Sequence, residues 1–300
     1  MYGRILVPLD GSPAAEQVLP LARLFARGLS ATIDLISVID LVELAHHVSA
    51  ADNLFLDSLA EDEARHRRKY LGDVAKGFSG GTVHCRVETG KAESVIIEAA
   101  ATEAATLIAM ATHGRSGLNR WLLGSVTEKV LRGSSHPLLL VRAAAGAPSA
   151  KAALQSIVVP LDGSPLAETV LPAVVDLAKK LDLAVILFRV YHIPYGVYDV
   201  SGSYGFDFER LLSGIEGTVQ QYLEEKRAAL QVAGLEKVTI ASKQGISADE
   251  IIEFSRKVPD SLIAMNSHGR SGVKRWVLGS VAETVVRHAA NPMLIFRATL

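Results

Sequence analysis

The chain has 300 residues, of which 49% are hydrophobic and 21% are charged. A chain of this length and composition can bury a substantial core, and it predicts about two globular domains. Its 31 lysines and arginines nearly cancel its 32 aspartates and glutamates, which gives a formal net charge of −1. Because the sequence shows no clustered basic face, we do not expect nucleic acid to be a partner.

The single cysteine, Cys85, excludes an intrachain disulfide framework and a metal site built from several thiolates. A strand-like run begins at Arg4, which leaves no room for a secretion signal before it. No apolar stretch approaches the ~20 residues that a membrane-spanning helix needs. We therefore expect a cytoplasmic protein with no membrane partner.

The first predicted elements are a strand and a helix joined by a short turn. Residues 5–9 form a short apolar run typical of a buried strand, and Asp10 and Ser12 follow it. A serine followed by a proline is typical of a helix start, so we expect a helix over residues 14–29. Pro20 falls inside that helix, where a proline should kink or shorten it.

The rest of the first half continues the same alternation. Short apolar runs predict further strands, and the longer stretches between them predict helices. The strands are expected at residues 32–39, 82–88, 106–111 and 138–141, and the helices at residues 53–76, 92–103 and 126–132. Runs of Val, Ile and Leu that alternate with helices indicate a parallel sheet covered on both faces. Five such strands in about 150 residues predict a doubly wound, Rossmann-like α/β fold.

The second half of the chain repeats the first. Residues 5–13 return as residues 157–165, and residues 110–142 return as residues 265–297. Both copies of the later block contain His-Gly-Arg-Ser-Gly and Gly-Ser-Val. Similarity of this kind within one chain indicates a duplication, so we expect two tandem domains with the same five-stranded parallel sheet.

An alanine-rich segment with Gly146 and Pro148 lies between the two copies and is typical of a linker. We expect domains at residues 1–145 and 155–300, joined by residues 146–154. Fusion of two copies fits a pseudo-dimer made within one chain, because such domains otherwise assemble as symmetric dimers. A further homodimer of chains and an unknown protein partner are both compatible with the sequence.

One segment of each copy lies where such folds bind ligands. In an open parallel sheet the site lies beyond the carboxyl ends of the strands, where the strand order reverses. After the fourth strand of the first copy come His113 and Gly114, then nine residues, then Gly124 and Ser125 before a helix that should start near Val126. The unpaired amides and partial positive charge of a helix start favour a phosphate group.

The glycines of this segment would let the backbone approach such an anion closely. Gly124 has no Cβ in the way, and Gly114 and Gly117 would let the loop fold back over the phosphates. Arg115 either contacts a phosphate or stays solvated. The second copy repeats the whole set, namely His268, Gly269, Arg270, Gly272, Gly279, Ser280 and Val281.

The serines of this segment also permit an interpretation without a ligand. Ser125 with Glu128, and Ser280 with Glu283, have the spacing of capping boxes, which satisfy the first amides of a helix internally. The preceding His-Gly-Arg-Ser-Gly loop and its nine-residue spacing are not needed for a cap. We therefore favour the phosphate interpretation, in which a cap and a ligand can also coexist.

The remaining polar candidates have two interpretations each. Asp10 and Asp162 either close turns at strand ends or lie beside a ribose or a phosphate-bound Mg²⁺. His113 and His268 either order their loops through hydrogen bonds or act as catalytic bases. The first alternative is favoured for the histidines, because no nucleophile and base can be paired with them from the sequence.

The familiar phosphate and metal motifs are absent from the sequence. It contains no G-x-x-x-x-G-K-[ST] loop, no G-x-G-x-x-G in its first strand-to-helix turn, and no H-E-x-x-H. We therefore expect a nucleotide-binding regulatory protein rather than an enzyme. A slow ATPase or adenylyl-transfer enzyme and a nucleotide-free dimeric interaction scaffold remain alternatives.

These motifs resemble the universal stress protein family in its tandem-domain form. The family signature is G-x-x-G, nine residues and then G-[ST], near the end of an α/β domain, and the resemblance covers both copies. It implies the strand order 3-2-1-4-5 of the adenine nucleotide alpha hydrolase-like fold. It also implies a role in the stress response and the binding of ATP, or of ADP or AMP, with Mg²⁺.

The resemblance also implies roles for individual residues. The glycines and serines described above would surround the phosphates, and Asp10 and Asp162 would lie by the ribose and the metal. Val38, near the end of the second strand, and its counterpart Val190 would meet the adenine through backbone groups.

The sequence departs from the family signature at its first glycine. Ala111 replaces this glycine in the first copy, and Asn266 replaces it in the second. Alanine adds one methyl group, whereas asparagine is larger although it tolerates unusual backbone angles. We therefore expect the second site to bind more weakly or to prefer a different nucleotide.

Overall fold

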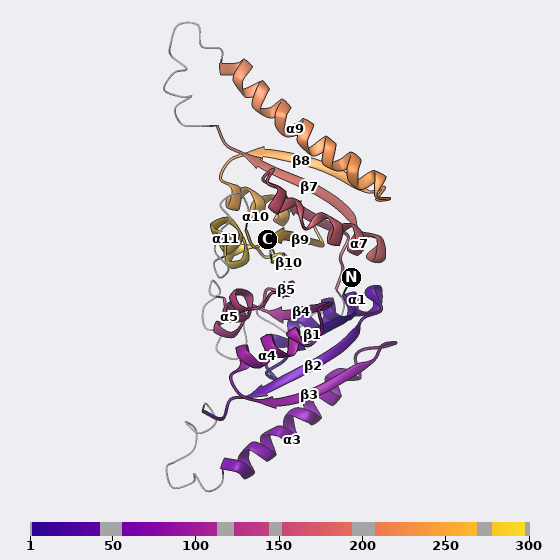
Figure 1. Ribbon diagram of the computed structural model, residues 1–300, viewed down its shortest axis with the longest axis vertical. Helices are drawn as coiled ribbons and strands as arrows, with labels where there is room; N and C mark the ends of the chain where they lie inside the picture. The colour runs from indigo at the N-terminus through magenta and orange to yellow at the C-terminus, as the bar shows by residue number, and fades with distance from the viewer. Residues whose placement is uncertain are drawn as a thin grey trace. The chain divides into compact units, whose positions relative to one another are not determined.

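A computed structural model describes most of the chain (Figure 1). The described residues are 2–42, 56–112, 123–143, 152–193, 208–268 and 278–297. They form two compact units. The first unit comprises Met1–Ala153 together with Pro292–Thr299, and the second comprises Leu154–Asn291.

The first unit alternates strands and helices along the chain, as the sequence predicts. Its strands from the first copy are β1 (Arg4–Pro8), β2 (Thr32–Ile39), β3 (Val83–Thr89), β4 (Thr106–Ala111) and β5 (Leu138–Val141). Its helices are η1 (Ala15–Val18), α1 (Leu19–Leu29), α3 (Leu56–Ala75), α4 (Ala92–Ala101) and α5 (Ser125–Gly133). In the described residues no helix is both long and apolar enough to span a membrane.

The five strands from the first copy are parallel and follow the order β3-β2-β1-β4-β5, which confirms the predicted order. Strand β1 lies at the centre, where Ile5 is opposite Ile33 of β2 and Leu107 of β4. Every residue of β4 is buried, whereas β3 at the edge is largely exposed. Because successive side chains of a strand point to opposite faces, a fully buried β4 means that both faces of the sheet are covered.

The second unit has the same organisation. Its strands are β6 (Ser156–Pro160), β7 (Ala184–Tyr191), β8 (Val238–Gln244) and β9 (Ser261–Asn266). Its helices are α6 (Pro165–Glu168), α7 (Leu171–Leu181), α9 (Phe208–Val232), α10 (Ser247–Lys257) and α11 (Ser280–His288). These strands are parallel in the order β8-β7-β6-β9, so the direction of winding reverses beside β6.

The last strand of the second copy, β10 (Met293–Phe296), belongs to the first unit. It pairs antiparallel with β5, and Leu294 is opposite Leu139. All four residues of β10 are buried. The first unit therefore has a sixth strand that comes from the far end of the chain.

The predicted effect of the repeated proline is confirmed. Pro20 lies in the first turn of α1, and Pro172 lies in the first turn of α7. Each is preceded by a separate short helix rather than by a continuous one, because a proline is tolerated in a first turn but not in a helix interior. Ser164 caps α6 as expected, since its Oγ accepts a hydrogen bond from Ala167 N at 3.2 Å.

A buried group of charges lies within the sheet of the first unit. Asp34 of β2 is 3% exposed and Arg4 of β1 is 5% exposed. Arg4 Nη1 lies 3.4 Å from Asp34 Oδ2, and Arg86 of β3 donates from Nε to Asp34 Oδ1 at 3.1 Å. Arg4 Nε also donates to Thr106 Oγ1 at 3.1 Å. Asp34 is thus the shared anion between two guanidinium groups, and both of its oxygens are engaged.

The second copy has no such charges at the same strand positions. There, Ser156 begins β6, Ile186 is the third residue of β7, and Ala241 is the fourth residue of β8. The two copies therefore fill equivalent sites with different chemistry, ionic in the first and mostly apolar in the second. The same fold therefore forms in the second copy without this ionic group.

Candidate functional site

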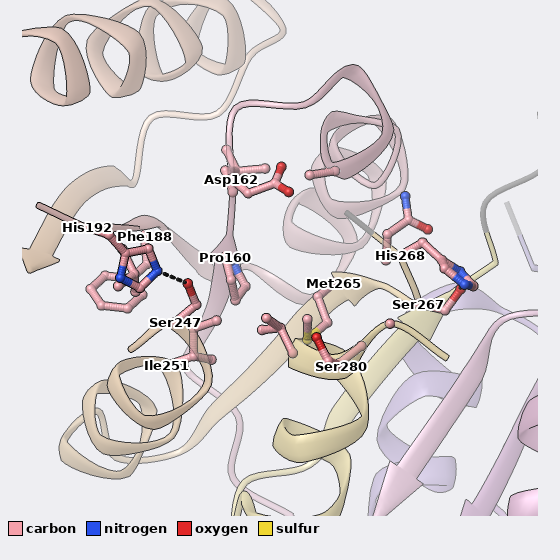
Figure 2. A pocket seen from close by; sticks show the side chains of 17 residues that line it. Pro160, Asp162, Phe188, His192, Ser247, Ile251, Met265, Ser267, His268 and Ser280 are labelled. Atoms are coloured by element: carbon pink, nitrogen blue, oxygen red, sulfur yellow. Dashed lines mark hydrogen bonds between the residues drawn. The ribbon is translucent and has the colours of Figure 1, made fainter. Parts of the chain in front are cut away.

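A pocket opens at the carboxyl ends of the strands in the second unit, where the direction of winding reverses. Its volume is about 290 Å³, close to the lower end of the ~300–1,000 Å³ range typical of small-molecule sites. The ends of β6, β7 and β9 and the starts of α10 and α11 line it (Figure 2). This is the position that the sequence predicts for a ligand site in a fold of this class.

The start of α11 forms one polar side of the pocket. Gly279 is the N-cap residue, with extended backbone angles φ −62° and ψ 146°, and its N–H donates to Ser267 O at 2.8 Å. The first intrahelical bond runs from Glu283 N to Gly279 O at 2.8 Å. The amides of Ser280 and Val281 precede that bond, so they lie in the turn where a helix presents its N–H groups outward. This turn carries the partial positive charge that attracts an anion.

The predicted capping boxes are wrong. Gly124 and Gly279, rather than the serines that follow them, are the N-cap residues of α5 and α11. Glycine has no side chain, so neither N-cap residue makes a side-chain cap hydrogen bond. Glu128 Oε1 instead accepts from Arg132 at 3.1 Å, and Glu283 Oε1 accepts from Arg287 at 2.9 Å. Each glutamate thus pairs with an arginine one turn later in its own helix. In a capping box it would instead reach back to the N–H of the N-cap residue.

Asn266 lies at the end of β9 and lines the pocket, although it is only 4% exposed. Its Nδ2 donates to Leu166 O and to Thr169 Oγ1, both in the segment around α6. Its Oδ1 has no hydrogen-bond partner among the residues that the structure describes. A buried acceptor without a partner is uncommon and costs free energy unless a ligand or a water supplies a donor.

The turn after β6 brings a carboxylate to the pocket. Asp162 Oδ1 accepts from Ser164 N at 2.9 Å and from Ser164 Oγ at 2.6 Å. Asp10 closes the equivalent turn of the first unit, where Ser12 N donates to its Oδ1 at 2.9 Å. The turn interpretation of both aspartates is therefore confirmed. Asp162 also lines the pocket, so this turn does not remove it from contact with a ligand.

Glycine is required in the same turn for two reasons. Gly163 has φ 86°, which is in the left-handed region, and an added Cβ would lie 2.8 Å from Arg189 Nη2. The Arg189 guanidinium in turn lies over the ring of Tyr222, 4.4 Å from its centroid. Burial and the hydrogen bond to Glu168 raise the pKa of Tyr222, so its hydroxyl remains a neutral donor at physiological pH. This packing holds the turn that positions Asp162.

The other end of the pocket is apolar with one polar pair. Phe188 and Ile251 form its wall, and Phe188 stacks on Phe254 with ring centroids 4.2 Å apart. His192 Nε2 and Ser247 Oγ are 3.1 Å apart at the far end. Figure 2 shows this pair on one side of the pocket and Ser267 and His268 on the opposite side, with Pro160 and Met265 between them. The pocket therefore suits a ligand with a flat apolar part between two polar ends.

Val190, the residue that the family resemblance assigns to adenine, lines this pocket. The carbonyl of Phe188, two residues earlier, accepts from Leu161 N at 2.8 Å and so points toward β6. Because carbonyls of a strand alternate in direction, the Val190 carbonyl points to the same side, beyond the end of β6. The pocket thus brings together Asp162, Val190, Asn266 and the start of α11.

The equivalent residues of the first unit are arranged differently around Val38. The Val38 carbonyl accepts a hydrogen bond from Arg67 Nη1 at 3.3 Å, and the same nitrogen donates to Ser37 Oγ at 2.9 Å. Arg67 is held in place by Glu63, whose Oε1 accepts from its Nε at 2.6 Å. A backbone group that was predicted to meet the base is therefore already bonded to a side chain of α3.

The start of α5 in the first unit is arranged like the start of α11 in the second. Gly124 N donates to Thr112 O at 2.6 Å, as Gly279 N does to Ser267 O in the second unit. Thr127 Oγ1 donates to the carbonyl of Ala111 at 3.0 Å, which ties α5 to the end of β4. Ser125 and Val126 form the first turn of α5. The loops between, with His113, Gly114, Arg115, Gly117, Gly269, Arg270 and Gly272, lie outside the described residues.

The structure offers a nucleotide-bound metal ion one carboxylate at the pocket. Across the described part of the chain, no three His, Cys, Asp or Glu side chains gather closely enough to bind one. A nucleotide-bound Mg²⁺ takes most of its ligands from phosphate oxygens and water and needs only one or two carboxylates. Asp162 fits that requirement, because its carboxylate borders the pocket that contains the start of α11.

Sequence reasoning missed the apolar wall of the pocket, including Phe188 and Ile251, and three polar residues. His192 and Ser247 have no counterparts of the same type in the first copy, where Asp40 and Ala92 stand, so the repeat gave no signal for them. Arg67 lies in the middle of a charged helix, and only its tertiary contact distinguishes it from its neighbours.

Several known proteins are similar to this chain. The family described as the universal stress protein family matches residues 1–142 and 153–297. A universal stress protein of Mycolicibacterium smegmatis is 26% identical over 301 residues, which is 99% of this chain and 97% of that protein. One from Methanocaldococcus jannaschii is 31% identical over 144 residues, 48% of this chain and 82% of that protein. The crystal structure of a universal stress protein from Archaeoglobus fulgidus has a TM-score of 0.72 at 19% identity, over the whole of both chains, and shares the fold.

Proposed function

Because the chain belongs to the universal stress protein family, we propose that it is a cytoplasmic stress-response regulator that binds ATP, or ADP or AMP, in the pocket of the second unit. The observation that carries the proposal is the pocket itself, which joins a helix start without a side-chain cap to a buried acceptor without a partner. The first feature favours an anion, and the second favours a ligand that donates a hydrogen bond.

The proposed nucleotide fits the pocket in one direction. Its phosphates lie on the amides of Ser280 and Val281, and its base lies against Phe188 and Ile251, with an edge toward the His192–Ser247 pair. An aromatic base gains from an apolar wall, and its polar edge needs partners at the far end. Mg²⁺ bound to the phosphates would take Asp162 as its protein ligand. The bound nucleotide then adds contacts between α10, α11 and the strand ends, through which occupancy stabilises the second unit.

We expect the natively purified protein to carry an adenine nucleotide. Native mass spectrometry should show a mass increase of one nucleotide per chain, which disappears when the protein is denatured. A ligand that binds only the folded state also raises the melting temperature by mass action, so added ATP should do so in a nucleotide-stripped sample. Protein that lacks a nucleotide and whose melting temperature ignores millimolar ATP, ADP and AMP would contradict the proposal.

We further propose that the second unit holds the tighter of two sites. From the size of Asn266 we expected the second site to bind more weakly. We now propose the opposite order of affinities, because Arg67 already donates a hydrogen bond to the Val38 carbonyl in the first unit. Replacing Arg67 by alanine releases that carbonyl for a base. The calorimetric stoichiometry should therefore rise from near one ATP per chain toward two.

Arg65 provides the matched control for Arg67. It lies on the same helix, and its Nη2 pairs with Asp62 Oδ1 at 2.9 Å on the exposed side. Arg65→Ala removes the same charge without touching Val38, so it should leave the stoichiometry unchanged. If Arg67→Ala and Arg65→Ala both bind as the wild type does, Arg67 does not restrict the first site.

A further inference from the structure

We propose that Asn266 recognises a sugar hydroxyl of the ligand and makes the second site selective for the ribose form of the nucleotide. The inference rests on the proposed nucleotide binding and adds the residue that determines which sugar is accepted. Asn266 stands where the family signature has a glycine, so the shared signature does not supply this role.

The orientation of the Asn266 carboxamide is fixed by its neighbours. Its nitrogen donates to the carbonyl oxygen of Leu166, which can only accept. The same nitrogen donates to Thr169 Oγ1. Exchange of the nitrogen and oxygen positions would place two acceptors against each other at Leu166. The two contacts therefore fix Nδ2 toward Leu166 and Thr169, and Oδ1 occupies the other position of the carboxamide.

That acceptor has no partner in the described part of the chain, although the side chain is 4% exposed and borders the pocket. Only a donor can satisfy it. A phosphate oxygen at neutral pH offers no proton and would be repelled by the amide oxygen. The ligand group beside Asn266 is therefore a hydroxyl or an N–H group.

The position of Asn266 along the pocket selects the hydroxyl. The next residue, Ser267, accepts a hydrogen bond from Gly279 N at 2.8 Å, so the end of β9 adjoins the start of α11. A nucleotide with its phosphates on α11 places the sugar next to them and its base farther away, toward His192 and Ser247. The donors of a ribose next to the phosphates are its 2′ and 3′ hydroxyls. Asp162, which also lines the pocket, faces the same part of the ligand.

The first unit lacks this acceptor, because Ala111 stands at the equivalent position. The two sites of one chain then differ in chemistry and not only in affinity. The second site offers the sugar the Asn266 acceptor, and the first site has no counterpart of it. Selectivity of this kind relies on a polar group of the protein that is left unpaired when the hydroxyl is missing.

Calorimetry with ATP, 2′-deoxy-ATP and 3′-deoxy-ATP tests the inference. The wild type should bind one of the two deoxy analogues roughly tenfold more weakly than ATP, the loss expected for one buried hydrogen bond. Asn266→Ala should bind ATP and that analogue equally well. The preference, rather than the affinity, is the readout, because a purely structural role of Asn266 would weaken all three ligands alike.

Thr169→Val is the control for the structural role of Asn266. It removes one of the two acceptors of Nδ2 and leaves Oδ1 in place, so the preference for ATP should persist. Equal binding of all three ligands by the wild type, or an unchanged preference in Asn266→Ala, overturns the inference while nucleotide binding stands. If the wild type binds none of the three, the proposed function itself fails.

Discussion

Replacing Gly279 by valine should remove nucleotide binding from the second unit. An added Cβ would lie 3.1 Å from Ser267 O and 3.5 Å from the Cα of His268, a tight contact with backbone that a side chain can enter only if the helix start or the end of β9 gives way slightly. The two valine methyl groups would also occupy the approach to the amides of Ser280 and Val281. Loss of two hydrogen bonds to a charged phosphate, each worth about 1.5–3 kcal/mol, predicts affinity at least about 100-fold lower.

Calorimetry with ATP measures this effect, and Gly217→Val is its matched control. Gly217 lies on α9, and an added Cβ there has no atom within 4 Å, so the same substitution should leave the affinity unchanged. Circular dichroism checks that both variants keep their helix content. Binding by a folded Gly279→Val variant with the wild-type affinity would place the phosphates elsewhere.

Replacing Asp34 by asparagine should destabilise the first unit strongly. The substitution leaves the buried Arg4 with only the exposed carboxylate of Glu103, 3.4 Å from its Nη1, and removes the shared partner of Arg86. Breaking a buried ion pair by removing one partner typically costs about 3–5 kcal/mol, because the remaining charge stays desolvated. We expect the free energy of unfolding to fall by about that amount in urea denaturation followed by circular dichroism.

Asp62→Asn is the control for this loss. Asp62 also pairs with an arginine, but its side chain is 54% exposed, and exposed pairs contribute about 0–1 kcal/mol. The comparison uses the unfolding transition that Asp34→Asn shifts, because a chain with two compact units need not unfold in a single step. Equal, small effects of the two substitutions would mean that Glu103, water or the neighbouring threonines compensate the Arg4 charge.

Much of the fold could be predicted from the sequence because the signals are local. Apolar runs such as residues 106–111 mark central strands, since a strand covered on both faces has no polar side. The repeat then extends each local prediction to the second copy. The repeat did not predict the grouping of β10 with the first unit, which depends on pairing between distant segments.

The helix start after β4 shows where local signals fail. Both glycine and serine are common N-cap residues, so the spacing of Ser125 and Glu128 suggested a serine cap. The structure shifts the cap by one residue to Gly124, because its N–H bonds Thr112 O and this contact fixes the direction in which the chain enters the helix. A tertiary contact therefore decides between two residues with similar preferences.

The candidate site was predictable in position but not in detail. The motifs located the start of α11 and Asp162, because these follow directly from strand ends and a repeated segment. The lone acceptor of Asn266 depends on the contacts of its amide nitrogen with Leu166 O and Thr169 Oγ1, and the contact with Val38 depends on the Arg67 side chain of α3. Neither contact has a sequence spacing that would identify it.

The central claim is that the amides at the start of α11 bind the phosphates of a nucleotide. Backbone amide NMR during titration with ATP tests it most directly, with adenosine as the ligand that lacks phosphate. We expect the Ser280 and Val281 amide resonances to shift saturably with ATP and much less with adenosine. If ATP binds but leaves these two resonances unchanged, the phosphates lie elsewhere and the account is wrong.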